Sequence, residues 1–408
     1  IVTLLAGLYP SLILSGFKPA VALKNKITSA KVGGISLRRG LVITQFAISQ
    51  VLIIGTIVAI SQMNFVRNAD LGYNKEAVLL LSASSDSSVV AKHDAFKQKL
   101  LQTQAVISVS FNTDAPSSEN IWSTNFAFNH QDDEKYQVQL KFADEDYFKT
   151  FGLTLLAGRG YDKSDTAKEV VINETLVKKL GLKNPQEAVG KDIRTGRSAW
   201  KQVVGVVKDF KTSSLKQSVP PLLLAEASKY YSVTAIKLRS SNLANAQVNI
   251  QNVWNDFYPE YAYTSSFLDE NINKFYQQEN QLSLLYKIFA VLAILISSLG
   301  LYGLVSFMAM QKTKEVGIRK VLGASSANIV FLFSKEFTIL ITIAFLIAAP
   351  LAYFMMNSWL QDFAYRIKMG AGIFIIAVLL SVFIAWITVG YKAIKAAVAN
   401  PVKSLRNE

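Results

Sequence analysis

Uninterrupted apolar runs are the strongest feature of the hydropathy pattern of this chain. Four runs carry no charged residue and reach about the 20 residues that a helix needs to cross a bilayer; they are Leu41–Ile60, Ile288–Met310, Phe337–Met356 and Met369–Tyr391. The pattern therefore predicts four complete membrane spans. A further apolar stretch at residues 1–17 lacks the charged leading region and the cleavage site of a signal peptide, and we interpret it as part of a truncated fifth span.

The placement of lysine and arginine indicates which segments face the cytoplasm. Residues 18–39 contain six basic residues and no acid, residues 311–335 contain five and one, and residues 392–408 contain four and one. Basic loops stay in the cytoplasm, so the remaining loops lie outside. The predicted order is a truncated span at 1–17, a cytoplasmic loop at 18–39, a span at 40–61, an outer domain at 62–284, a span at 285–310, a cytoplasmic loop at 311–335, a span at 336–357, a short outer loop at 358–368, a span at 369–391 and a cytoplasmic tail at 392–408.

Composition and charge narrow the classes of function. With 51% apolar and 18% charged residues, the chain is too apolar for an ordinary soluble enzyme. Residues 62–284 contain 25 basic and 25 acidic residues, so the net charge of +14 belongs to the membrane and cytoplasmic segments. We therefore expect a lipid bilayer as a partner and no nucleic acid. The lack of cysteine and the presence of two histidines argue against a metal site.

Residues near the two ends of the chain repeat one another. Tyr9 and Pro19 are spaced like Tyr391 and Pro401, and a Leu-basic pair follows each proline four residues later. Two interpretations remain open: a chance match between short basic segments, or the end of a preceding repeat. The second makes this chain the C-terminal half of a duplicated membrane unit.

The outer segment has the pattern of a mixed α+β domain with one or two cores. Strand-like runs are predicted at Ala77–Ser82, Val106–Phe111, Tyr136–Phe142, Glu169–Ile172, Gln202–Val207, Ser232–Leu238 and Tyr261–Phe267. Helical patterns occupy Val89–Gln104, Asp144–Phe151, Glu174–Leu180 and Leu243–Phe257. The stretch Leu268–Lys287 is free of glycine and proline and predicts one helix that enters the next span.

Candidate catalytic groups are scattered rather than paired. We expect Asp132–Glu134 at a solvated hairpin tip, Asp144–Asp146 at a helix N-terminus that complements the helix dipole, and His93 on a helix surface. The sequence contains no G-x-S-x-G, H-E-x-x-H or G-x-x-x-x-G-K-[ST] pattern. The chain is therefore not expected to be an enzyme, to bind a cofactor or to hydrolyse ATP by itself.

The loop after the second complete span contains a short amphipathic segment. Its apolar and charged residues suit a helix at the cytoplasmic surface that ends at a glycine. Two interpretations are equally compatible with the pattern: docking in the groove of a partner protein, with Glu315 and Arg319 fixing the register, or resting on anionic lipid. The candidate docking residues are Glu315, Val316, Gly317, Ile318, Arg319, Lys320, Leu322, Gly323 and Ala324. Within the spans, we expect Gln45 and Ser49 to contact another helix and Pro350 to be able to kink its own.

The run Glu315–Ser325 resembles the E-[IV]-G-I-R-[KR]-x-x-G-A-[ST] signature of the FtsX-like permease family. The outer segment resembles the MacB-type periplasmic core in Asp146–Phe148, Gly152-Leu153, Leu156–Arg159 and Val203–Phe210. The loop around Phe363–Ile367 and the tail Ala397–Arg406 are similar to duplicated permeases of Bacteroidetes.

This resemblance implies an α-helical membrane protein of the bacterial inner membrane with a large periplasmic α+β domain. It implies a permease of an ABC transporter, in which a separate ATPase subunit binds the ATP and docks on the segment Glu315–Ala324. The work would be export of a lipoprotein, peptide or drug, or alternatively signal transmission to a periplasmic hydrolase or sensor without transport. Further implied partners are the missing N-terminal half of the permease or a second permease copy, and a periplasmic adaptor, lipoprotein or hydrolase.

Overall fold

The computed structural model describes residues 34–164, 167–239, 243–312, 315–316, 318–319 and 322–398. The expected truncated span at 1–17 lies outside these residues, as do most of the loop at 18–39 and the end of the tail. Two compact units are present. Of the described residues, those up to Ile60, Ser283–Ser358 and those from Lys368 form the helical unit, and those within Ser61–Leu282 and Trp359–Ile367 form the outer unit.

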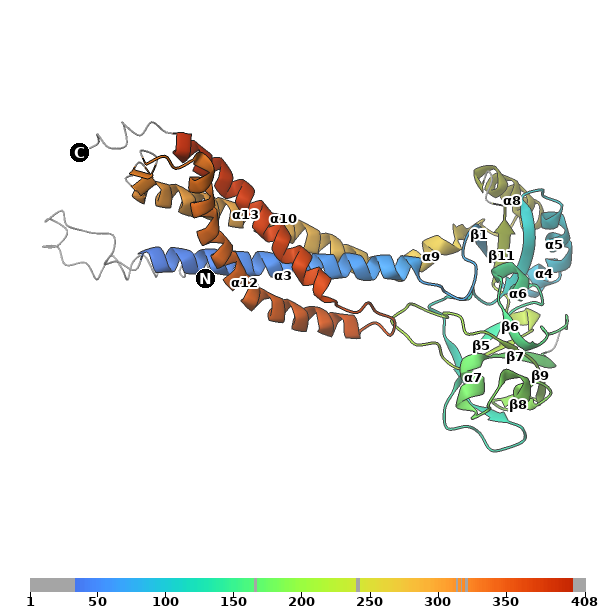
Figure 1. The fold of residues 1–408 in the computed structure, drawn as a ribbon. Coiled ribbons are helices and arrows are strands. Elements are labelled where there is room, and N and C mark those ends of the chain that lie inside the picture. Colours follow the sequence, from blue (N-terminus) through green and yellow to red (C-terminus); the bar gives the residue numbers. More distant parts are fainter. Residues whose placement is uncertain are drawn as a thin grey trace, which may run out of the picture. The chain divides into compact units, whose positions relative to one another are not determined.

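Within the described residues, four helices of the helical unit are each long and apolar enough to cross a membrane (Figure 1). They are α3 (Gly34–Asn68), α10 (Gln277–Gln311), α12 (Ser326–Gln361) and α13 (Ala371–Val398). Large apolar side chains such as Leu299, Leu346 and Phe354 are exposed on their outer faces, as expected of surfaces that contact lipid. The prediction of four complete spans is confirmed.

Polar side chains inside the helical unit join neighbouring helices. The hydroxyl oxygens of Ser49 on α3 and Ser297 on α10 are 2.8 Å apart, and the Gln50 amide nitrogen donates to the carbonyl oxygen of Ile341 at 3.4 Å. This confirms that Ser49 contacts another helix. Helix α12 contains Pro350 and is bent along its length (Figure 1); a proline removes one backbone donor and is a common cause of such bends.

The first sheet of the outer unit is antiparallel, in the order β12-β1-β11-β2. Its strands are β1 (Val78–Ser82), β2 (Val106–Asn112), β11 (Val233–Leu238) and β12 (Ser265–Phe267). Helices α5 (His93–Leu101) and α8 (Leu243–Phe257) share a core with it, while α4 (Ser87–Val90) is a single turn. In α8 the residues Ala246, Ile250 and Trp254 are buried, because a spacing of four residues returns to the same side of a helix.

A second sheet is inserted in the sequence between β2 and β11. Its order is β3-β5-β10-β7-β9-β8-β4, with β6 paired to β9. The strands are β3 (Trp122–Thr124), β4 (Phe126–Phe128), β5 (Val138–Phe142), β6 (Leu155–Gly158), β7 (Glu169–Asn173), β8 (Asp192–Thr195), β9 (Lys201–Val207) and β10 (Leu222–Ala225). Strands β3 and β4 are consecutive in the chain yet pair at opposite ends of this order, so one short segment covers both edges of the sheet. Helix α7 (Glu174–Lys179) contacts β7 of this sheet, whereas α6 (Tyr147–Phe151) contacts β2 and β11 of the first sheet.

Most predicted runs correspond to strands or helices of the structure, although the helix predicted at Val89–Gln104 is divided into α4 and α5. The predicted runs coincide with β1, β2, β5, β7, β9, β11, α7 and α8, whereas β3, β4, β6, β8 and β10 were missed. The single helix predicted at Leu268–Lys287 is wrong, because α9 (Leu268–Lys274) ends before α10 begins at Gln277. Tyr276 lies at this break with its side chain buried, and its hydroxyl oxygen accepts a hydrogen bond from the Leu215 N–H at 2.6 Å.

Strand β6 approaches β9 so closely that two glycines are required. Gly158 has φ +66°, and a Cβ atom there would lie 2.1 Å from the carbonyl oxygen of Val204. A Cβ atom on Gly205 would lie 2.1 Å from the carbonyl oxygen of Arg159. Gly181 has a similar φ of +74°, but a Cβ atom there would meet no described atom within 4 Å.

We expect Gly158→Ala to destabilise the outer unit far more than Gly181→Ala. Both substitutions place a side chain in the left-handed region, which costs about 1–2 kcal/mol, but only Gly158→Ala also forces two backbones apart. The urea midpoint of the outer unit is measured for both variants in the purified protein, with limited proteolysis as the readout of unfolding. Equal midpoints for the two variants would contradict the close approach of β6 and β9.

Candidate functional site

The predicted docking segment lies between α10 and α12, and its apolar side chains divide into two groups. Val316 is only 8% exposed and packs in a cluster with Met308, Ile329 and Phe333. Ile318 and Leu322 are 54% and 80% exposed. These two residues are four apart and therefore share one side of a helical turn. Among the described residues of the segment, Val316 thus anchors it to the helical unit, while Ile318 and Leu322 remain available on its outer side.

The local sequence explains why the segment stops where it does. Gly323 has φ +91°, and the Ala324 N–H donates to the carbonyl oxygen of Arg319 at 2.9 Å. A left-handed glycine with such a hydrogen bond terminates helices. Ser325 then starts α12, because its hydroxyl oxygen accepts from the Asn328 N–H at 3.2 Å. The Gly-Ala-Ser sequence therefore fixes the end of one helical turn and the start of the next helix.

The charged residues of the segment form short ion pairs. Arg319 lies 2.8 Å from Glu315 one turn earlier, with both side chains about half exposed; such a surface pair contributes little to stability. Nearby, Glu336 of α12 pairs with Arg39 of α3 and lies 3.6 Å from Lys312. The predicted docking residues Gly317 and Lys320 lie outside the described residues.

A second candidate site lies in the outer unit, at the loop between α12 and α13. The side chain of Gln62 on α3 is fully buried. Its amide nitrogen donates to the carbonyl oxygen of Tyr365 at 3.1 Å, and its amide oxygen accepts from the Ile367 N–H at 3.0 Å. The sequence did not indicate that Gln62 binds the backbone of this loop, because a polar residue at the end of an apolar run is typical of an ordinary helix surface.

The same loop pairs with the segment that follows β9. The N–H groups of Tyr365 and Ala364 donate to the carbonyl oxygens of Leu215 and Lys216 at 3.1 and 3.2 Å. Lys216 forms an ion pair with the buried Glu279 of α10. We call this set the loop junction, defined by Gln62, Leu215, Lys216, Tyr276, Glu279 and Ala364–Ile367. It joins the outer ends of α3 and α10 to the loop at 359–367.

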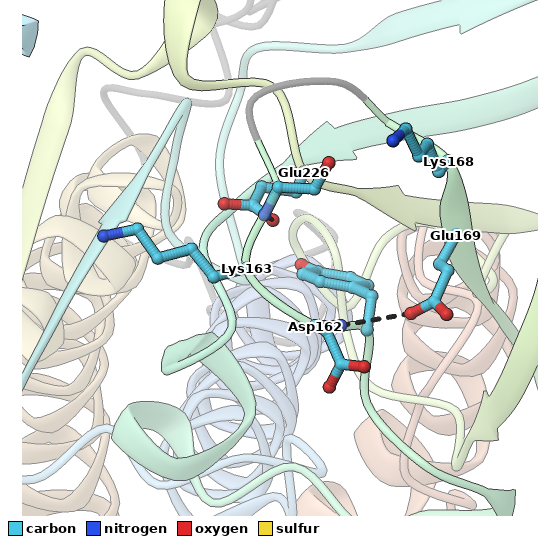
Figure 2. Close-up of a pocket in the computed structure, with 7 residues that line it drawn as sticks. Asp162, Lys163, Lys168, Glu169 and Glu226 are labelled. Atoms are coloured by element: carbon cyan, nitrogen blue, oxygen red, sulfur yellow. Dashed lines mark hydrogen bonds between the residues drawn. The ribbon is translucent and has the colours of Figure 1, made fainter.

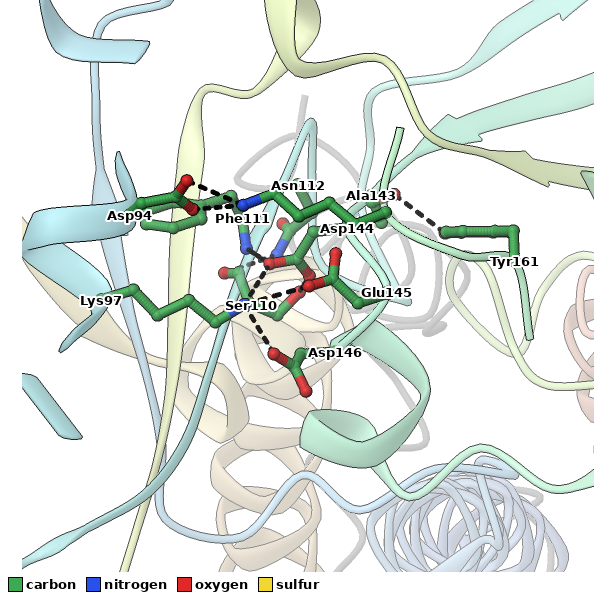
Figure 3. Close-up of polar contacts among 11 residues, drawn as sticks. Asp94, Lys97, Ser110, Phe111, Asn112, Ala143, Asp144, Glu145, Asp146 and Tyr161 are labelled. Atoms are coloured by element: carbon green, nitrogen blue, oxygen red, sulfur yellow. Dashed lines mark hydrogen bonds and ion pairs between the residues drawn. The ribbon is translucent and has the colours of Figure 1, made fainter. Parts of the chain in front are cut away.

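A cluster of charged groups joins the two sheets of the outer unit (Figure 3). Lys97 of α5 lies 3.0 Å from Asp144 and 2.6 Å from Asp146. The Asp144 carboxylate also accepts from the Ser110 hydroxyl at 2.6 Å and from the Phe111 N–H at 3.0 Å. Burial raises the pKa of Asp144 to about 6.

One prediction about this region is confirmed in position and another is wrong. Asp144–Asp146 lies at the N-terminus of α6 as predicted, although Asp146 makes no side-chain cap and the Asp144 carboxylate is buried against β2. His93 is not on the surface: it is 7% exposed, and its ring stacks on Phe111 with centroids 4.0 Å apart. The inward face of α5 comprises His93, Phe96 and Leu100, and burial lowers the pKa of His93 to about 4.

Next to the cluster lies a pocket of about 220 Å³ that contains Glu226 (Figure 2). The Ser164 N–H donates to Glu226, and burial raises the pKa of this carboxyl to about 7. Arg159 holds Glu169 with two hydrogen bonds of 2.9 and 2.6 Å. The described part of the chain contains no group of three or more acidic or histidine side chains placed to hold a metal ion. These contacts hold segments of the outer unit together and supply no nucleophile with an adjacent base.

Two family models match the chain. The MacB-like periplasmic core domain matches residues 45–253, and the C-terminal domain of FtsX-like permeases matches residues 287–401. The chain belongs to this permease family. It is accordingly a MacB-like permease of the ABC transporter class, a multi-pass membrane protein with a periplasmic domain of α+β structure.

Similar proteins agree with the family models. The chain is 26% identical over 281 residues to the macrolide export ATP-binding/permease protein MacB of Neisseria meningitidis, which covers 65% of this chain and 42% of that protein. The chain thus spans about two-fifths of the length of this relative. The protein of the same name from Chromobacterium violaceum is 22% identical over 277 residues, or 64% of this chain and 42% of that protein.

Solved structures include the periplasmic region of MacB from Actinobacillus actinomycetemcomitans, with 15% identity, a TM-score of 0.35 and coverage of 50% of this chain and 94% of that one. The extracellular domain of the transporter YknZ from Gram-positive bacteria has 16% identity, a TM-score of 0.33 and coverage of 46% and 98%.

Burial of the His93 imidazole makes an acid-sensitive contribution to the stability of the permease. The pKa of His93 is lower in the folded than in the unfolded protein, so folding is weakened as the pH falls from about 6.5 toward 4. Asp144 and Glu226 act oppositely, because their raised pKa values favour folding at low pH. His93→Phe retains the ring and removes only the histidine contribution, which amounts to about 2 kcal/mol at pH 5.

We therefore expect His93→Phe to lose less unfolding free energy than the wild type when the pH is lowered from 7.5 to 5. Urea unfolding at both pH values measures the loss. His130 is exposed, so His130→Phe is the matched control. A His93→Phe variant with the wild-type pH dependence would show that the buried imidazole does not control acid stability.

Proposed function

We propose that this permease couples ATP hydrolysis by a separate ATPase subunit to movement of its periplasmic unit. The observation that carries the proposal is the exposed pair Ile318 and Leu322, held on a segment whose other side is anchored by Val316. A short apolar face on a capped turn suits the groove of a partner protein. The bacterial inner membrane is the proposed location.

The anchoring of the segment supports transmission of force. Val316 packs against residues of both α10 and α12, so a displacement of the segment would be passed to two spans at once. Close-packed side chains transmit such displacements because interiors have low compressibility. The ion pairs of Glu336 with Arg39 and Lys312 also connect α12 to α3 and to the residue that follows α10.

The loop junction supports the proposed transmission of motion at the outer ends of α3 and α10. Gln62 and Glu279 belong to helices that run on into the helical unit, while Leu215 and Lys216 follow β9 of the inserted sheet. Helix α3 also continues through a short loop to β1, and β12 leads directly into α9. Motion of the outer ends of α3 and α10 would therefore be transmitted to both sheets of the periplasmic unit.

The proposed work is export of a lipoprotein, peptide or drug. The curated relatives carry macrolide export in their names, which places drugs among the cargo classes to test. Those names also include an ATP-binding part, whereas the sequence of this chain has no phosphate-binding loop. In the proposed assembly a separate subunit supplies nucleotide binding, together with a second permease half and a periplasmic adaptor.

The docking segment predicts a specific uncoupling phenotype. Leu322→Trp should block a shape-complementary groove, and Arg319→Glu should reverse one charge on the docking surface. Both variants should insert normally, and both should lose ATPase co-purification and permease-stimulated ATP hydrolysis at least five-fold. If the segment instead rests on lipid, Leu322→Trp should behave as the wild type, because tryptophan favours membrane interfaces. Leu299→Trp, on an exposed position of α10, is the matched control.

The loop junction predicts a phenotype at the opposite end. Gln62→Met keeps the length of the side chain but removes both hydrogen bonds, and it leaves a partly buried carbonyl and a partly buried N–H without their partner at a cost of up to about 1–3 kcal/mol. We expect the ATPase to remain bound and active while export falls at least five-fold. Asn64→Met, on an exposed position of the same helix, should keep export. Full export by Gln62→Met would show that the loop junction is not needed to transmit motion to the periplasmic unit.

A further inference from the structure

A groove of about 560 Å³ opens in the periplasmic unit where the outer end of α3 and helix α9 supply its walls. Four of its side chains are buried and apolar or aromatic: Met63, Val66, Ile272 and Tyr276. Charged and amide side chains complete the lining, namely Arg67, Lys75, Asp269, Asn273 and Asn280. The groove therefore combines an apolar wall with groups of both charges.

The charges in the groove are not neutralised within the described part of the chain. Arg67 donates a hydrogen bond to the Asn280 amide oxygen at 3.3 Å, and Lys75 donates to the carbonyl oxygen of Arg67 at 3.1 Å. The Asp269 carboxylate accepts from the Glu270 N–H at 3.0 Å. Among the described residues, none of Arg67, Lys75 and Asp269 has an ion-pair partner. Two cations and one anion are thus available to a ligand.

The position of Arg67 along α3 indicates how far this side of the groove lies from the hydrocarbon core of the membrane. It follows Ile60, the last residue of the apolar run, by seven residues, which is about 10 Å of helix. Polar headgroups occupy about 5–8 Å on each side of the hydrocarbon. Side chains of a helix tilt toward its N-terminus, and in α3 this direction leads back toward the membrane. The guanidinium of Arg67 is therefore within reach of headgroups in the outer leaflet.

We propose that this groove binds the phosphoethanolamine headgroup of a phospholipid from the outer leaflet of the surrounding membrane. Arg67 and Lys75 receive the phosphate, which accepts charge-assisted hydrogen bonds from both. Asp269 receives the primary ammonium group. The start of the acyl chains lies along Met63 and Val66. A glycerol headgroup would leave Asp269 without a cation, and a trimethylammonium group has no N–H to donate.

Native mass spectrometry of the detergent-purified protein tests this proposal. Phosphatidylethanolamine, phosphatidylcholine and phosphatidylglycerol are added in equal amounts, and the retained lipids are counted. We expect at least five-fold more phosphatidylethanolamine than either other lipid. Arg67→Ala with Lys75→Ala should abolish retention of all three, whereas Asp269→Asn should remove only the preference over phosphatidylglycerol. Lys274→Ala changes an exposed lysine of α9 outside the groove and should behave as the wild type.

Three results would overturn the proposal. Equal retention of the three lipids by the wild type would show that no headgroup is selected. Loss of selection in Lys274→Ala as strong as in Arg67→Ala with Lys75→Ala would indicate general charge attraction. Displacement of the lipid by millimolar inorganic phosphate would indicate a site for free phosphate. Because Asp269→Asn reports preference rather than retention, it remains informative even if the double variant folds poorly.

Discussion

The hydrogen bonds of one buried amide hold together the part of this permease on which the rest depends. Gln62 is enclosed, and both ends of its side chain bind the backbone of the loop between α12 and α13. A buried amide is stable only when its donor and acceptor are both satisfied. The loop must therefore keep its position against α3, and its backbone is at the same time paired with Leu215 and Lys216. Segments far apart in the sequence are in this way held by a few short-range contacts.

The two sheets of the periplasmic unit are also joined by polar groups, and this makes their contact different from an apolar core. Lys97 on one side meets Asp144 and Asp146 on the other, and Asp94 pairs with Lys163 at 2.6 Å (Figure 3). The Asp94–Lys163 pair is exposed and contributes little. The Lys97–Asp144 pair is buried, and a buried ion pair adds little net stability compared with apolar packing but strongly penalises any arrangement that separates the partners. The contact therefore specifies one relative placement of the sheets. The contact between the sheets therefore defines one resting conformation of the periplasmic unit, which is proposed to move during the transport cycle.

The sequence predicted what depends on long patterns and missed what depends on tertiary contact. Apolar runs of about twenty residues indicated the four spans, and shorter strand-like runs indicated β1, β2, β7, β9 and β11. Strands of three or four residues, such as β3 and β4, carry too few positions to show a period. His93 was misplaced because its neighbours Lys92 and Asp94 are polar, although its own position faces the core of α5. Gln62 and its two backbone partners are three hundred residues apart, and no local pattern encodes that contact. Of the docking segment, the sequence predicted the glycine stop at Gly323 but not the division between buried Val316 and exposed Leu322.

The insertion of one sheet between β2 and β11 has a consequence for how the chain matures. Val78 of β1 pairs with Lys237 of β11, so the first sheet stays incomplete until the whole insertion has emerged on the far side of the membrane. Closing a loop of that length is slow, and contacts of high sequence separation are the last to form. The inserted sheet has its own core and covers its own edges, so it is suited to fold first and to bring β2 and β11 together. During that interval β1 exposes an unpaired apolar edge, which makes translocation the stage at which this permease is most exposed to aggregation and to proteases.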